Sequence, residues 1–70
     1  MNKLYYYEIP GHPESSFVSE WQTIEECVEA CKAKCLELGV DYDDPRVKLY
    51  LSDDFGDTFE ECTEEGELAG

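Results

Sequence analysis

Three short stretches of the chain have the hydrophobic patterns typical of β-strands. Aromatic and branched side chains dominate the first stretch, residues 3–9, and a Pro-Gly turn signal follows it. The second, residues 16–21, is predicted to return antiparallel to the first, and the third is residues 46–52. In the first strand, the side chains that we expect to face the core are Tyr5, Tyr7 and Ile9.

A helical period replaces these strand patterns between residues 23 and 39. Thr23 and Glu26 are spaced as a capping box at a helix start, and Gly39 is a typical helix stop. Six apolar side chains fall on one stripe at about 100° per residue, and most of the other positions are charged. The stripe consists of Ile24, Cys27, Val28, Cys31, Cys35 and Leu38. One amphipathic helix packed on a small sheet is therefore predicted.

Residues 58–63 fit two structures. Their sequence, Thr-Phe-Glu-Glu-Cys-Thr, resembles the helix start Thr-Ile-Glu-Glu-Cys, but the apolar side of a second helix would contain little beyond Phe59, Cys62 and Leu68. A charged edge strand paired with residues 46–52 needs only Phe59 to pack, and charge on an edge discourages aggregation. We therefore expect a strand.

These elements predict an α+β fold: a small antiparallel sheet of three to four strands with one amphipathic helix on one face, in ββαββ order. The 70 residues are few enough to form a single domain with a thin core. The last few residues are expected to fray.

Charge narrows the choice of partner. Eighteen acids against five bases give a net charge of −13, and residues 41–70 contain eleven of the acids and two of the bases. Nucleic acid and anionic membranes both require positive charge at the contact, so neither is expected to bind directly. The expected partner is a basic protein.

The carboxylates, together with aromatic anchors, form the predicted partner-binding surface. Alternate residues on a strand lie about 6.6 Å apart, close to the spacing of successive phosphates in nucleic acid. A strand would therefore repeat charge at multiples of this interval, with Glu60 and Glu64 on one face and Asp57, Glu61 and Glu65 on the other. The acidic candidates are Asp41, Asp43, Asp44, Asp53, Asp54, Asp57, Glu60, Glu61, Glu64 and Glu65, and the aromatic candidates are Tyr6, Tyr50 and Phe55.

The four cysteines favour a structural role over catalysis, metal binding or disulfides. Cys27, Cys31 and Cys35 point the same way along the helix, and the outer two are about 12 Å apart, too far for one zinc ion. The chain's single histidine, His12, lies in a loop away from them, so no base is placed to activate a thiol. Neither of the two acidic segments, residues 41–44 and 53–57, has the residue order of an EF-hand. We therefore expect reduced thiols, no enzyme and no cofactor, with weak calcium binding by the carboxylates as an alternative.

No apolar run reaches the roughly 20 residues that span a bilayer, and the N-terminus lacks the features of a signal peptide, so a cytoplasmic location is expected. In size, charge and build the chain resembles the inhibitors that phages and mobile elements make against host nucleic-acid machinery, such as anti-CRISPR and anti-restriction proteins. No family motif carries this resemblance, so it assigns no residue. It implies an inhibitor that blocks a basic nucleic-acid-binding surface. The alternative is an acidic module that docks on a transcription or replication protein without competing with nucleic acid.

Overall fold

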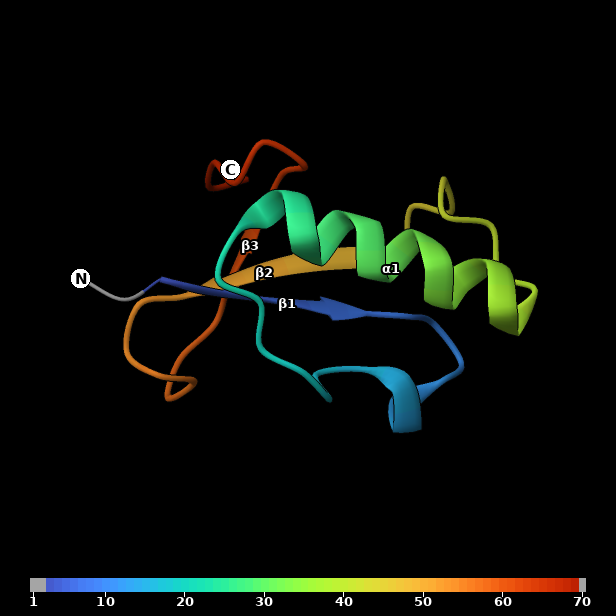
Figure 1. The fold of residues 1–70 in the computed structure, drawn as a ribbon, viewed down its shortest axis with the longest axis horizontal. Helices are drawn as coiled ribbons and strands as arrows, with labels where there is room; N and C mark the ends of the chain where they lie inside the picture. The colour runs from blue at the N-terminus through green and yellow to red at the C-terminus, as the bar shows by residue number, and fades with distance from the viewer. Residues whose placement is uncertain (1–2, 70) are drawn as a thin grey trace.

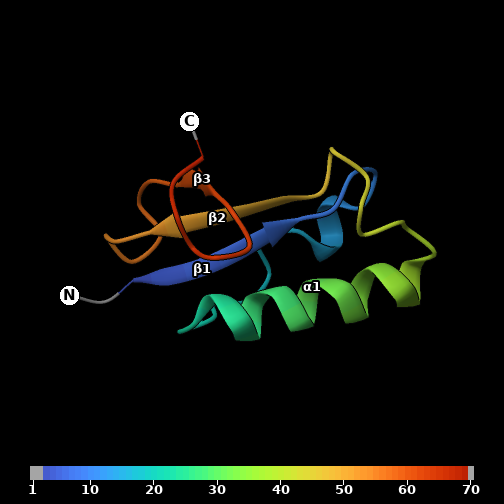
Figure 2. The same cartoon turned by 90° about the horizontal axis from the view of Figure 1, so that it is seen from above.

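The structure is a computed structural model that describes residues 3–69. In chain order it contains strand β1 (Leu4–Glu8), the 3-10 helix η1 (Pro13–Ser15), helix α1 (Ile24–Leu38) and strands β2 (Lys48–Ser52) and β3 (Glu60–Cys62). The sheet forms one layer and α1 the other, as Figures 1 and 2 show. The predicted α+β class is therefore confirmed, but the order is β-α-β-β and not ββαββ.

The three strands form one antiparallel sheet in the order β1-β2-β3. Tyr7 lies opposite Leu49, and both are buried in the core beneath α1. Ile9, just after β1, is also buried, at 1% exposure. The predicted core face of the first strand is thus confirmed, and Tyr5 packs at its margin.

Helix α1 begins and ends where its sequence signals predict. The Thr23 hydroxyl accepts a 3.2 Å hydrogen bond from the Glu26 amide, and Gly39 closes the helix at a φ of 75°. The apolar stripe faces the sheet, with four of its side chains buried and two, Val28 and Leu38, packed partly buried against the core. No helix within residues 3–69 has the length and apolar character needed to cross a membrane.

The prediction of a strand over residues 16–21 is wrong. This segment does run antiparallel beside β1, since Trp21 exchanges two backbone hydrogen bonds with Tyr5 (2.8 and 3.1 Å) and the Phe17 amide donates to the Tyr7 carbonyl (2.9 Å). However, Phe17 has a φ of 57°, far from extended geometry, which interrupts the ladder. What remains is an isolated bridge at Trp21.

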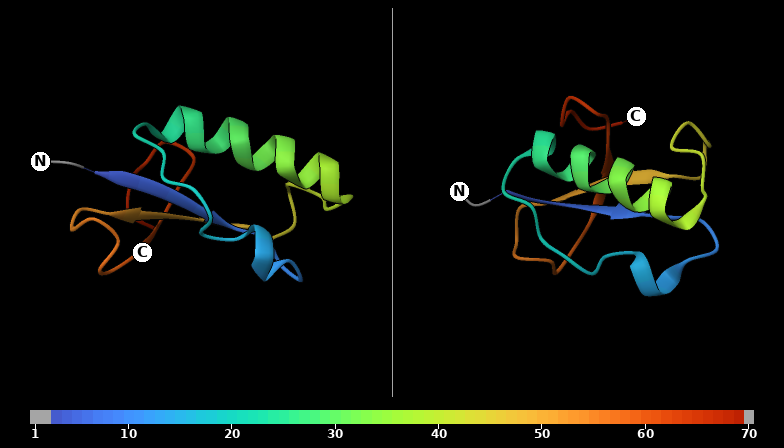
Figure 3. Two further views of the ribbon diagram at one scale, coloured as in Figure 1. Left: turned by 60° about the horizontal axis from the view of Figure 1, so that its bottom comes forward. Right: turned by 45° about the vertical axis from the view of Figure 1, so that its right-hand side comes forward.

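Strand β3 confirms the strand expected near residues 58–63, at the edge of the sheet beside β2. Its inward side chain is Cys62, which is 5% exposed. The chain then turns back along β3: Leu68 bridges Cys62, and the Ala69 amide donates to the Glu61 carbonyl at 3.0 Å. Figure 3 shows this return in dark red. Fraying was expected here, but Leu68 and Ala69 are paired with β3, and Gly70 lies outside the described residues.

The sheet face opposite α1 carries an aromatic cluster of Tyr6, Phe17, Tyr50 and Phe59. Phe17 lies 5.1 Å from both Tyr50 and Phe59, and Tyr6 meets Phe59 edge-on at 4.9 Å, measured between ring centroids. Tyr6 is therefore only 5% exposed, whereas Phe17 and Phe59 are 39% and 41% exposed. The outer face of the sheet thus has a small apolar layer of its own.

Candidate partner-binding surface

The predicted acidic side chains are spread over three turns and the edge strand. Eight of the ten are exposed and two, Asp44 and Asp54, are half-buried. Asp41, Asp43 and Asp44 lie between α1 and β2, Asp53, Asp54 and Asp57 between β2 and β3, Glu60 and Glu61 in β3, and Glu64 and Glu65 in the turn that follows.

The expected row of carboxylates at strand spacing does not form. Strand β3 ends at Cys62, so Glu64 and Glu65 lie in a turn instead of continuing it. Within β3, successive side chains point to opposite faces, which separates Glu60 from Glu61. The negative charge therefore surrounds the edge of the sheet without following the spacing of phosphates.

The basic side chains are largely occupied by contacts within the protein. Lys34 pairs with Glu37 at 3.0 Å, Arg46 with Asp44 at 2.9 Å and Lys48 with Glu61 at 3.3 Å, while the Lys32 ammonium lies 5.3 Å from the centre of the Tyr42 ring. Four of the five bases are thus engaged, and three of these meet a carboxylate. Most of the eighteen acids therefore have no basic partner among residues 3–69.

Two of the predicted acids stabilise turns. The Asp54 carboxylate accepts hydrogen bonds from the Thr58 hydroxyl (2.5 Å), the Thr58 amide (2.9 Å) and the Ser52 hydroxyl (2.7 Å), and these bonds, that from the Thr58 hydroxyl foremost, lower its pKa to about 2. The Asp44 carboxylate accepts from the guanidinium and the amide of Arg46, which lowers its pKa to about 2 as well. Both carboxylates have a structural task and are poor choices for a binding test.

The three predicted aromatic anchors differ in what they offer a partner. Tyr6 is covered by its neighbours in the aromatic cluster. Tyr50 is half-buried, and its hydroxyl donates a 3.1 Å hydrogen bond to Glu8. Phe55, in the turn between β2 and β3, is 71% exposed and makes the most prominent aromatic candidate.

Sequence reasoning missed Phe17 and Phe59 as surface residues. Each presents about two fifths of its surface to solvent on the outer face of the sheet. Their position on this face results from packing against Tyr6 and Tyr50. The cluster brings together side chains from four separate segments of the chain. The alternation of apolar and polar residues within one segment does not predict the packing of these four rings.

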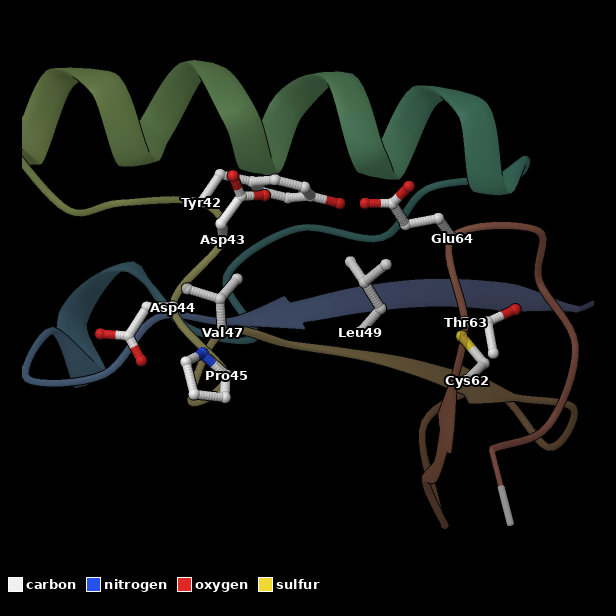
Figure 4. A pocket seen from close by; sticks show the side chains of 9 residues that line it. All are labelled: Tyr42, Asp43, Asp44, Pro45, Val47, Leu49, Cys62, Thr63 and Glu64. Carbon is white, nitrogen blue, oxygen red and sulfur yellow. The ribbon is translucent and has the colours of Figure 1, made fainter.

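A groove of about 290 Å³ opens between the loop after α1 and the turn after β3 (Figure 4). Val47 and Leu49 supply apolar lining, and Asp43 and Glu64 contribute carboxylates. The Tyr42 hydroxyl points toward Glu64, and burial, with this carboxylate nearby, raises the pKa of Tyr42. A groove that combines apolar side chains with acidic groups is chemically suited to the stem and charged end of a lysine or arginine side chain.

The four thiols are buried and free. Burial raises the pKa of Cys27 and of Cys31 to about 12, and it raises the pKa of Cys35 and of Cys62 as well. They therefore remain protonated and weakly nucleophilic at neutral pH. Within residues 3–69, no three His, Cys, Asp or Glu side chains are grouped so that they could hold a metal ion.

Comparison with known proteins finds no relative. No family model matches the chain, and no curated protein or solved structure matches it either.

Proposed function

We propose that the protein is a small cytoplasmic inhibitor that binds the basic nucleic-acid-binding surface of another protein and keeps nucleic acid from reaching it. Phages and mobile elements encode inhibitors of this type against restriction and CRISPR systems. The observation that carries the proposal is the distribution of charge. Four of the five bases contact other groups of the same chain, whereas most carboxylates are exposed, and the net charge is −13.

Such a charge has a physical cost, because like charges on a small domain repel and oppose compaction. A net charge of magnitude about 2 to 8 is enough for the solubility of a small domain, so solubility alone does not account for the excess. A basic partner relieves the repulsion on binding, and the field accelerates encounter with it. The proposed complex therefore forms quickly at low ionic strength and weakens as salt is added.

The surface that we assign to this contact is the end of the sheet around the turn between β2 and β3. Asp53 and Asp57 are exposed there and are not among the carboxylates that hold the turn. They flank the exposed Phe55, which gives an apolar centre with charged neighbours. Protein interfaces concentrate their binding energy in such aromatic centres.

One observation favours a second candidate function. Since β3 ends at Cys62, the carboxylates do not repeat at the interval of phosphates, and the chain copies the charge of nucleic acid but not its spacing. A module that docks on a transcription or replication protein beside its nucleic-acid site requires charge without that spacing. Competition with nucleic acid distinguishes the two functions.

The test uses the immobilised protein and a nuclease-treated bacterial lysate. Bound proteins are eluted with duplex DNA or with RNA at constant ionic strength and identified by mass spectrometry. The inhibitor function predicts that nucleic acid releases a bound nucleic-acid-binding protein, whereas a docking module stays bound to its partner. A column that carries an unrelated protein of equal net charge is the control, and identical retention on both columns would refute both functions.

A further inference from the structure

Two residues other than glycine have positive φ within residues 3–69, and both are phenylalanines: Phe17 at 57° and Phe55 at 59°. An L-amino acid with a bulky side chain is strained in this left-handed region, which glycine adopts without strain. Hydrogen bonds of a turn can hold the backbone there whatever the residue, so phenylalanine is favoured over glycine only where its ring makes contacts, either within the protein or with another molecule.

Phe17 has its compensation within the protein. Its ring centroid lies 5.1 Å from those of Tyr50 and Phe59, and 6.3 Å from that of Tyr6. Phe55 differs, since it is 71% exposed and takes no part in the aromatic contacts of the described residues. For the stability of the turn alone, glycine would be more favourable than phenylalanine at residue 55.

The turn around Phe55 is held firmly by hydrogen bonds. The Ser52 hydroxyl accepts from the Gly56 amide at 2.8 Å and donates to Asp54 at 2.7 Å, and Asp54 in turn accepts from the Thr58 amide at 2.9 Å. These bonds fix the backbone on both sides of Phe55. The turn projects from the end of the sheet, in orange in Figure 1, so the ring is presented in a preorganised position, which reduces the entropy lost on binding.

We propose that Phe55 is the anchor of the partner contact, an aromatic side chain that enters an apolar pocket rimmed by lysine and arginine on a basic protein. This inference rests on the proposed function and names its central residue. Asp53 and Asp57, both exposed, lie two residues before and two residues after Phe55, and their charge matches a basic rim. The net charge of −13 opposes a second copy of this chain as the occupant, and equally opposes nucleic acid.

The first test measures strain. Phe55→Gly and Phe55→Ala both remove the exposed ring, but only glycine relieves the left-handed backbone, so Phe55→Gly is expected to melt a few degrees above Phe55→Ala. Leu36→Ala is the matched control, because Leu36 is 84% exposed on α1, where it takes ordinary helical geometry. A midpoint of Phe55→Gly equal to or below that of Phe55→Ala would show that no strain is stored there and would overturn the proposal.

The second test measures recognition with two synthetic peptides of equal length and charge, one alternating lysine with leucine and the other lysine with serine. The wild-type protein is expected to bind the leucine peptide more tightly, and Phe55→Ala to weaken that binding about fivefold or more, the scale of a hot-spot truncation. Leu36→Ala is expected to bind like the wild type. Equal binding of both peptides, or equal losses in the two variants, would overturn the anchor. Neither result affects the competition test of the inhibitor function, so the two proposals fail separately.

Discussion

The Ser52 hydroxyl, almost fully buried, donates a 2.7 Å hydrogen bond to the Asp54 carboxylate just beyond the end of β2. Asp54 also accepts from Thr58, and together these bonds close the turn that presents Phe55. Asp54→Asn loses part of this network and is expected to lower the thermal midpoint at neutral pH. Asp53→Asn, an exposed neighbour, is the control and should change it little.

The same carboxylate predicts a pH dependence. The pKa of Asp54 is about 2 in the folded protein and 3.8 without its partners, so its contribution to stability is present above about pH 4 and is lost as the pH falls toward 2. The difference in thermal midpoint between the wild type and Asp54→Asn should therefore be largest near pH 7 and should disappear as the pH falls from 4 to 2. Circular dichroism melts across this range measure it, and a difference independent of pH would contradict the assignment.

Neutralising the exposed acids beside Phe55 is expected to weaken binding to the partner far more than neutralising acids on α1. The test pair is Asp53→Asn with Asp57→Asn, and the control pair is Glu25→Gln with Glu29→Gln, all four residues being exposed. Glu26 is left out because it belongs to the helix cap. Association rates at low and high salt should separate the pairs, and equal effects would exclude the assigned surface.

Ile9 is expected to be essential for stability. It is 1% exposed in the core beneath α1, and truncating such a side chain to alanine typically costs about 2–5 kcal/mol. A domain of this size has little stability to spare, so Ile9→Ala should be largely unfolded or melt far below the wild type. Leu36→Ala, an exposed aliphatic truncation, should change the free energy of unfolding by less than about 0.5 kcal/mol in urea titrations.

The four thiols should react slowly in the folded protein. Burial shields them from reagents and keeps their pKa values above neutral pH, so the thiolate fraction is small. Titration with a thiol-specific chromogenic disulfide at pH 8 should show slow release in buffer and rapid release of four equivalents in urea. Fast reaction in buffer would contradict the buried arrangement.

Salt should stabilise the fold, since it screens repulsion at a net charge of −13. The thermal midpoint is expected to rise between low and high sodium chloride. Calcium chloride at matched ionic strength separates screening from binding of the ion: an equal rise indicates screening, and a larger rise indicates calcium held by the carboxylates. A midpoint that falls with salt would contradict the role assigned to repulsion.

The helix and the faces of β1 and β2 could be predicted from sequence because local signals determine them. The capping pair of Thr23 and Glu26 and the stop at Gly39 act within a few residues. Alternation likewise placed Tyr7 and Leu49 on the buried face. Each of these predictions required one segment and the knowledge that a core lies on one side of it.

The failures come from contacts between segments. Alternation in residues 16–21 suggested a strand, but Phe17 leaves extended geometry and packs across the outer face of the sheet, which covers Tyr6. Counting charges likewise could not separate Asp54, which holds a turn, from exposed Asp53. Both distinctions depend on hydrogen bonds and packing that form only when the sheet is assembled.

The return of the chain along β3 has a consequence for the behaviour of shortened forms. The Ala69 amide donates to the Glu61 carbonyl, and the Glu67 carbonyl accepts from the Thr63 amide, so both β3-side groups are paired that would otherwise lie open at the sheet's margin. A chain cut after Thr63 would leave them free to pair with the same strand of another molecule. At low salt, mutual repulsion would keep such molecules apart, and at high salt they would self-associate, so pairing of residues 67–69 with β3 is expected to protect the protein from polymerisation.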